Sequence, residues 1–271
     1  MTRRLSEIYI YPVKSLGGIS LSESLLTERG LAYDRRWMLV DEQGFMTQRK
    51  YPKMALLRVA LENDHLRIWS PDEHLPLEVP LAVESFFPRR VPIWDDTTAA
   101  WQVTRQADAW FSEALDHPCS LVYMPDNSER QVVGEISDQT HAVSFADSYP
   151  ALLVGQASLD DLNTRLAAPV PMNRFRPNLV FTGGAPYEED RWHAFQLGEA
   201  ACTAEKACAR CNVITIDQAT AERGKEPLAT LSRYRRQGNK VLFGQNVLLE
   251  ADKTIRVGEA VRVETYKPEF S

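Results

Sequence analysis

Cys202-Thr-Ala-Glu-Lys-Ala-Cys208-Ala-Arg-Cys211-Asn-Val-Ile-Thr-Ile-Asp217 holds three of the four cysteines of the chain. Cys208 and Cys211 have Cys-x-x-Cys spacing, and Arg210 stands between them. The run that follows, residues 212–216, is rich in β-branched residues, which favour strands. We therefore expect a strand at this run, with Cys211 at its start.

Two common kinds of Cys-x-x-Cys site do not match this cysteine pair, and two other roles remain. A thioredoxin-like pair would open a helix within a βαβ unit, and a zinc ribbon would need a second Cys-x-x-Cys or two histidines. Neither pattern accompanies this pair. A thiolate beside an arginine suits a soft-metal ligand or a reactive thiol. The alternative is a pair of buried, inert cysteines, because free cysteine often behaves as a small core hydrophobe.

Length and composition restrict the function classes. A chain of 271 residues allows one large or two modest domains. The net charge of −6 argues against nucleic-acid binding through bulk electrostatics. The first residues lack the apolar region of a secretory signal, and no apolar run approaches a membrane span. Four cysteines are too few for a disulfide framework, so we expect a cytoplasmic protein. From the charge and the apolar runs we expect no nucleic-acid partner and no membrane partner.

Short strands dominate the expected secondary structure. Alternating and β-branched runs between turn signals predict them along most of the chain. A closing hairpin is expected at residues 254–264, around Gly258. The other expected strands are residues 5–13, 35–41, 44–49, 57–61, 66–69, 121–124, 151–154 and 179–182. A mainly β, barrel-rich fold follows from this pattern.

Only a few helices are expected. Apolar residues at helical spacing predict one at residues 105–116. Ser158 as N-cap, with Asp161 three residues later as a capping box, predicts the start of a second. Pro227 can occupy the first turn of a third. The polar residues 125–139 are expected to form an exposed loop, and we place a domain boundary there, dividing the chain into 1–125 and 126–271.

Three segments combine basic and amide side chains beside expected strand ends. They are Lys14-Ser15, Arg35-Arg36 and Arg174-Phe-Arg176-Pro-Asn178. Arginine and lysine neutralise phosphate, and arginine does so bidentately. Each segment alone is equally typical of a solvated loop. Together with a thiolate metal ligand, they indicate a site for a phosphorylated, metal-carrying ligand.

Seven motifs resemble those of the MOSC family, named for the molybdenum cofactor sulfurase C-terminal domain. The resemblance covers nearly the whole chain and is closest to the mitochondrial amidoxime-reducing component and bacterial YcbX-type proteins. It implies a MOSC N-terminal β-barrel-like domain and a MOSC β-barrel domain, with the molybdenum cofactor between them. The motifs are Tyr11-Pro-Val-Lys-Ser15, Gly30-Leu-Ala-Tyr-Asp-Arg35-Arg-Trp37, Ser144-Phe-Ala-Asp147, Phe175-Arg-Pro-Asn178, Cys208-Ala-Arg-Cys211, Glu226-Pro-Leu228 and Phe243-Gly-Gln-Asn246.

The resemblance also implies roles for individual residues. Cys211 would be the protein thiolate on molybdenum, with Arg210 beside it as a second catalytic residue. Six positions match those that hold the cofactor or line its site: Lys14, Ser15, Arg35, Asp147, Arg176 and Asn178. Cys208 is given a supporting role. Gln245 and Asn246 belong to a shared motif without an evident physical role, and Cys119 and Cys202 are expected in the core.

The implied activity is reduction of N-hydroxylated compounds, such as amidoximes, hydroxylamines and N-hydroxylated bases, by oxygen-atom transfer to molybdenum. Some bacterial relatives carry a ferredoxin domain, but this sequence has no Cys-x4-Cys-x2-Cys run and hence no expected iron–sulfur cluster. Electrons would come from a separate donor of ferredoxin or flavoprotein type. The alternatives are a sulfur carrier, whose cysteine persulfide comes from a pyridoxal-phosphate desulfurase, and a non-catalytic cofactor-binding protein.

Overall fold

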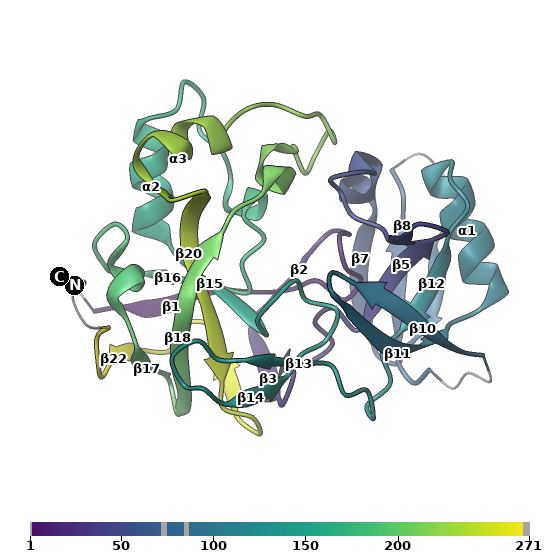
Figure 1. Cartoon of the computed structure of the whole chain (residues 1–271), viewed down its shortest axis with the longest axis horizontal. Coiled ribbons are helices and arrows are strands. Elements are labelled where there is room, and N and C mark those ends of the chain that lie inside the picture. Colours follow the sequence, from purple (N-terminus) through teal and green to yellow (C-terminus); the bar gives the residue numbers. More distant parts are fainter. Residues whose placement is uncertain (1, 72–74, 84–86, 268–271) are drawn as a thin grey trace.

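The computed structural model describes residues 2–71, 75–83 and 87–267. Within these residues the protein has 22 strands and three α-helices, α1 (Arg105–Leu115), α2 (Gln156–Thr164) and α3 (Leu228–Tyr234). Figure 1 shows two lobes, with α1 in one and α2 and α3 in the other. The prediction of a mainly β fold with few helices is confirmed. No helix of the described residues is long and apolar enough to cross a membrane.

The second lobe is built on a nine-stranded sheet that curls toward closure. Two contacts join the strand Arg4–Ile10 to the residues just before the strand Val261–Val263. They are a β-bridge between Arg4 and Ala260 and a 2.9 Å hydrogen bond from Leu5 N to Glu259 O. Strand β19 (Arg236–Gln237) pairs with β20 outside the main path. The path runs β2 (Ile19–Leu21), β1 (Arg4–Ile10), β16 (Leu179–Thr182), β15 (Ala151–Gly155), β20 (Lys240–Leu249), β18 (Ala200–Ala209), β17 (Ala194–Leu197) and β22 (Val261–Val263).

Apolar side chains form a hydrophobic core on each face of this sheet and stabilise it. One face packs around large residues such as Phe181, Trp192 and Phe195, all of them buried. On the other face, Leu159 and Leu162 of α2 join a core with Val154 and Val180. Burial of one such side chain contributes about 1.5–3 kcal/mol, so these two cores stabilise the lobe far more than its short helices do alone.

The first lobe combines two smaller sheets. Trp37 and Leu39 pack with Phe111 of α1 in its core. Thr104 caps α1 by accepting a 3.0 Å hydrogen bond from Ala107 N, as Thr at an N-cap commonly does. One sheet runs β10 (Pro88–Ile93), β11 (Asp96–Gln102), β12 (Ser120–Tyr123), β5 (Trp37–Asp41) and β6 (Gly44–Phe45), and the other runs β7 (Arg58–Glu62), β8 (His65–Trp69) and β9 (Leu77–Pro80).

The strand expected at residues 212–216 is wrong. Asn212–Thr215 form the 3-10 helix η4, which Cys211 precedes. Ile214 is buried within this helix and Ile216 directly after it, so both apolar residues that favoured a strand reach the core without one. Cys211 therefore follows strand β18 instead of opening a new one.

Two further local predictions are wrong. α2 begins at Gln156 rather than after Ser158, whose hydroxyl donates to the buried Glu189 carboxylate and leaves no capping box. Residues 254–264 form no hairpin, because β21 (Thr254–Arg256) pairs with β3 (Glu23–Thr27) while β22 pairs with β17.

Residues 125–139 are more ordered than a plain loop. They contain β13 (Gln131–Val133), which pairs with β14 (Thr140–Ala142). β4 (Gly30–Leu31) completes the three-stranded sheet with β3 and β21. The boundary proposed here, near residue 125, stays a prediction.

The two lobes meet along a seam of backbone hydrogen bonds. Arg35 N donates to Tyr11 O at 3.0 Å, and Arg35 O accepts from Phe145 N at 2.9 Å. The Phe145 side chain completes an apolar core with first-lobe residues such as Met38 and Val40. This seam brings the predicted site segments together.

Candidate functional site

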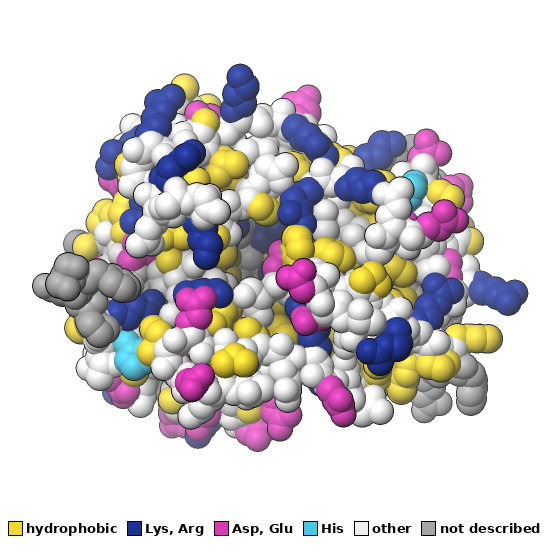
Figure 2. Space-filling model, in the orientation of Figure 1, with side chains coloured by type: hydrophobic (Ala, Val, Ile, Leu, Met, Phe, Trp, Pro, Cys, Tyr) yellow, Lys and Arg dark blue, Asp and Glu magenta, His cyan; other side chains and the backbone are white. Residues whose placement is uncertain are grey.

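All eight predicted site residues line one cavity, here called the site cavity, of about 330 Å³. Its walls come from both lobes, and Figure 2 shows Lys and Arg side chains around a hollow between them. The eight residues lie on five separate segments: Lys14 and Ser15 after β1, Arg35 before β5, Asp147 before β15, Arg176 and Asn178 before β16, and Arg210 and Cys211 after β18.

Three of these residues hold a left-handed backbone conformation. The φ angles are 70° at Ser15, 50° at Arg35 and 53° at Arg176. For a residue with a Cβ atom this conformation costs about 1–2 kcal/mol, and such strain concentrates where a side chain must be aimed precisely at a site. The turns therefore direct their side chains and amides into the site cavity at some cost in stability.

Lys14 and Asp147 form an ion pair in the wall of the cavity. Lys14 Nζ donates to the Asp147 carboxylate and, at 2.8 Å, to Phe145 O. Burial lowers the pKa of Lys14, although the Asp147 charge opposes the shift. The enclosing protein raises the pKa of Asp147, but Lys14, Arg35 and the indole of Trp94 outweigh it and bring the pKa to about 2. Asp147 is thus ionised at neutral pH.

Tyr11 lies against two guanidinium groups. The Arg35 guanidinium carbon is 4.7 Å from the centre of the Tyr11 ring, and that of Arg176 is 4.2 Å from it. The cation–π attraction from one ring helps to keep two like charges close together. Burial lowers the pKa of Arg176 to about 10, with the neighbouring Arg35 charge adding to the shift. Two cations held this close favour a multivalent anion such as phosphate.

Asn178 forms hydrogen bonds that hold neighbouring residues of the site in place. It is almost wholly buried, and its Oδ1 accepts from Arg35 Nη1 at 2.9 Å and from Leu152 N at 3.2 Å. Its Nδ2 donates to Tyr9 O at 3.1 Å. Asn178 therefore positions Arg35 and ties β1 to β15, which is a more structural role than the direct cofactor contact expected for it.

The two thiols of the Cys-x-x-Cys pair have different surroundings. Cys211 is exposed in the site cavity. Cys208 Sγ accepts a 3.1 Å hydrogen bond from Arg210 Nη1, while Arg210 Nη2 donates to Phe175 O at 2.7 Å. The Arg210 Nε atom is buried without a partner. Arg210 thus contacts the first thiol of the pair, whereas the expectation placed it beside the second.

The other two cysteines are core residues. Cys119 and Cys202 are buried, and burial raises the pKa of both thiols, that of Cys119 to about 11. Outside residues 1, 72–74, 84–86 and 268–271, no group of three or more His, Cys, Asp or Glu side chains is placed to hold a metal ion. Both Cys208 and Cys211 line the site cavity, and Cys211 is the more exposed of the two soft thiol ligands.

Several cavity residues were not predicted from the sequence. Gln48 lines the cavity, and its Nε2 donates to Gln218 Oε1 of the other lobe at 3.0 Å. Trp94 Nε1 donates to Asp147 Oδ1 at 3.2 Å, and the Arg49 guanidinium stacks on the Trp94 ring. None of these four residues lay inside a motif, whereas Tyr11, which contacts Arg35 and Arg176, stood in the first motif three residues before Lys14.

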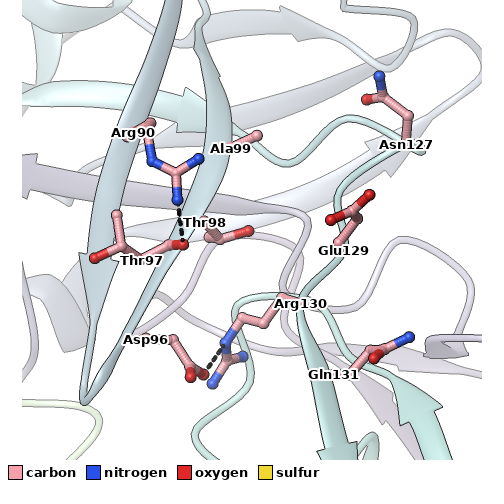
Figure 3. A pocket seen from close by; sticks show the side chains of 9 residues that line it. All are labelled: Arg90, Asp96, Thr97, Thr98, Ala99, Asn127, Glu129, Arg130 and Gln131. Atoms are coloured by element: carbon pink, nitrogen blue, oxygen red, sulfur yellow. Dashed lines mark hydrogen bonds and ion pairs between the residues drawn. The ribbon is translucent and has the colours of Figure 1, made fainter.

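A separate pocket of about 450 Å³ lies between the β10–β11 hairpin and residues 127–131. Figure 3 shows Arg130 in its wall, paired with Asp96 at 3.0 Å. None of the eight predicted residues lines this pocket. Arg130 Nη1 also donates to Ser144 O at 2.5 Å and Ala146 O at 2.8 Å, so it supports the backbone that leads to Asp147.

The sequence matches two known domains over most of its length. Residues 2–118 match the MOSC N-terminal beta barrel domain, and residues 140–262 match the MOSC domain. The chain is 36% identical over 262 residues to a molybdenum cofactor sulfurase of Oryza sativa subsp. japonica, covering 89% of this chain and 32% of that protein. It thus spans about a third of the length of that relative.

The amidoxime-reducing components are similar over more of their length. The chain is 35% identical over 281 residues to the mitochondrial amidoxime-reducing component 1 of Mus musculus, covering 95% of this chain and 81% of that protein. The chain is 31% identical over 278 residues to the mitochondrial amidoxime-reducing component 1 of Homo sapiens, covering 95% of this chain and 82% of that protein. With both domains present in order, the chain belongs to the MOSC family, as its motifs predicted.

Proposed function

We propose that this protein is a reductase of N-hydroxylated compounds that uses the molybdenum cofactor and receives electrons from a separate donor protein. The observation that supports it most is the composition of the site cavity. One exposed thiol, Cys211, and a cluster of cations that includes Arg35 and Arg176 share a space of about 330 Å³. A soft-metal ligand beside a phosphate-binding cluster is the donor set that a phosphorylated, metal-carrying cofactor requires.

The residues present fit this cofactor. Arg35 and Arg176 would hold its phosphate, because their guanidinium groups lie together on the Tyr11 ring. Cys211 would supply the protein thiolate to the metal. The buried, unpartnered Nε of Arg210 leaves one hydrogen-bond donor in the wall still to be satisfied.

When bound, the molybdenum cofactor would supply the two-electron redox and oxygen-atom-transfer chemistry. The protein positions the reactants and provides a fixed field of charges. Arg210 keeps a positive charge beside the thiol pair, and Asp147 fixes Lys14 Nζ in the wall of the same cavity.

Elemental analysis tests this proposal. The protein is expressed in a host that makes the cofactor and in a host that cannot, and molybdenum is measured in both. We expect near-stoichiometric molybdenum only from the first, together with reduction of benzamidoxime by a chemically reduced viologen. Molybdenum absent from both preparations would contradict the proposal, and retained molybdenum without turnover would identify a cofactor-binding protein.

A sulfur carrier is the second candidate, and the hydrogen bond from Arg210 to Cys208 favours it. A thiolate beside a guanidinium is the species that accepts sulfane sulfur. The similarity to molybdenum cofactor sulfurases agrees with this role. Intact-mass analysis after incubation with a pyridoxal-phosphate desulfurase and cysteine tests it: one added sulfur atom, lost in Cys208→Ser or Cys211→Ser, would support the carrier.

A further inference from the structure

A second cavity, larger than the site cavity, adjoins it. It has a volume of about 880 Å³ and lies between the β18–β20 region and residues 135–136. Lys206, Ala207 and Lys240 line both cavities. The two spaces therefore share a wall, and a ligand in one lies next to the other.

The second cavity is strongly cationic although the whole chain carries −6. Three acidic side chains line it, and two of them are paired, Asp190 with Arg235 and Glu135 with Lys206. Six cationic side chains line it: Arg191, Lys206, Arg235, Arg236, Lys240 and Lys267. The excess of three positive charges is concentrated in one concave surface.

Three of these cations are available to a ligand. Within the described part of the chain, Arg236, Lys240 and Lys267 make no ion pair with a carboxylate. The β19–β20 hairpin places Arg236 and Lys240 at the rim, because Arg236 pairs with Val241 and Gln237 with Lys240. Two exposed cations at a rim and one farther inside are an arrangement that suits a small anion.

Lys267 is held inward by the Gln245 side chain. Its Nζ donates to Gln245 Oε1 at 2.8 Å, and Gln245 Nε2 donates to Asp190 Oδ1 at 2.8 Å. Gln245 is fully buried. Burial lowers the pKa of Lys267, an effect that an anion beside it would reverse. One ammonium hydrogen is used by Gln245, which leaves the others for a ligand.

This contact gives a physical role to a motif that had none. In β20, Asn246 lines the site cavity, while the adjacent Gln245 bonds to Lys267 of the second cavity. The Phe243–Asn246 motif therefore serves both spaces. Asn246 thus borders the site cavity, and Gln245 positions Lys267 at the cationic second cavity.

We propose that the second cavity binds the anionic group, carboxylate or phosphate, of a substrate whose N-hydroxyl group lies in the site cavity. The inference rests on the proposed reductase function and specifies its substrate class. Lys267 and Arg236 hold the anion, and the shared wall at Lys206 and Lys240 directs the rest of the molecule toward Cys211. Neutral N-hydroxylated compounds bind the same site cavity without this contribution.

The first test measures binding without turnover. 4-Carboxybenzamidine and benzamidine are the products that the proposed reaction would form, and neither can react further. Isothermal titration of the full chain should give about tenfold tighter binding of the carboxylate compound, since a hydrogen bond to a charged group contributes this much. Lys267→Gln and Arg236→Gln should each remove most of the difference. Lys253→Gln is the matched control, because Lys253 lines neither cavity.

The second test measures kinetics of the cofactor-loaded protein. 4-Carboxybenzamidoxime should show a KM about tenfold below that of benzamidoxime, with a similar kcat. Lys267→Gln should raise the first KM and leave the second unchanged. Equal KM values for the two substrates, or a variant that weakens both equally, would overturn the inference. If neither substrate is reduced, the proposed function fails, and the binding measurement still decides whether the anion site exists.

Discussion

Arg210 donates a 3.1 Å hydrogen bond to the sulfur of Cys208 rather than to that of Cys211, although it stands between the two in sequence. Cys208 lies in strand β18 and Cys211 just beyond it, so the chain turns between them. The charged group thereby supports one thiol and leaves the other exposed in the site cavity. The two cysteines are expected to respond differently to substitution.

Cys211→Ser should abolish molybdenum–thiolate coordination and activity, because serine replaces the soft ligand with a hard one. The free energy of unfolding should change by less than about 0.5 kcal/mol, since the side chain is exposed. X-ray absorption at the molybdenum edge measures the ligand. Cys202→Ser is the control: this buried residue should cost about 1–3 kcal/mol of stability and keep the metal ligand. Equal loss of coordination in both variants would contradict the assignment.

Arg176→Ala should weaken cofactor binding about tenfold or more. The substitution removes one of the two cations on the Tyr11 ring, and with it the charged hydrogen bonds that we propose Arg176 makes to the cofactor phosphate. Molybdenum content after dialysis measures the effect. Arg233→Ala, an exposed arginine on α3, should retain the cofactor fully. Unchanged occupancy in Arg176→Ala would argue against a phosphate-binding role.

Asn178→Ala should lower the free energy of unfolding by about 2–3 kcal/mol, because it leaves buried polar partners unsatisfied on β1 and at Arg35. Denaturant titration measures this. The exposed Asn239→Ala offers a comparison that should stay within about 0.5 kcal/mol of the native chain. A stable Asn178→Ala protein that fails to bind cofactor would instead show a direct contact.

Glu189 should make stability depend on pH. Its side chain is fully buried, and burial raises its pKa from 4.5 to about 7. The folded state therefore binds the proton more tightly than the unfolded state. The stabilisation is complete below pH 4.5 and is lost as the pH rises through 7, by about 3 kcal/mol in total.

The matched variant is Glu189→Gln, which keeps an acceptor for Ser158 and Gly155 without the charge. Thermal unfolding between pH 5 and pH 8 measures the difference between the two proteins. The variant should gain stability relative to the native chain as the pH rises. Parallel melting curves across this range would show that Glu189 does not titrate there.

Gly30→Ala should destabilise more than Gly258→Ala, although both glycines have φ near 95°. A Cβ atom at Gly30 would lie 2.9 Å from Pro150 O, whereas at Gly258 it would meet nothing within 4 Å. The backbone strain alone costs about 1–2 kcal/mol, and the close approach adds to it at Gly30. The denaturation midpoints of the two variants measure the difference, and Gly30→Ala should have the lower one.

The eight predicted site residues, which line one cavity, were picked out from sequence because their motifs are short and contiguous. Lys14, Arg35 and Arg176 each stand in a turn near a strand, where composition alone is equally typical of a solvated loop, and the family motifs set them apart. Gln48 and Trp94 reach the cavity only through packing of the lobes. No local pattern marks them, and sequence reasoning therefore missed them.

Strand β18 shows why local propensity failed near the cysteines. Ala200–Ala209 contains mostly alanine and polar residues, which have little preference for strands, yet it pairs with both β17 and β20. The β-branched residues after Cys211 had the stronger propensity and formed helix η4 instead. In β18, pairing with two neighbours outweighed intrinsic preference. In η4, the 3-10 turn places Ile214 in the core without strand pairing.

Strand β1 carries a consequence for how the chain is made. It pairs Ile8 with Leu179, 171 residues later, inside the sheet of the second lobe. During synthesis the first strand leaves the ribosome long before its partner exists, while the first lobe can already fold behind it. Contacts so distant in sequence slow folding, so closure of the second lobe is expected to be the late step. An exchange of lobes between family members would have to move the first ten residues together with the C-terminal half.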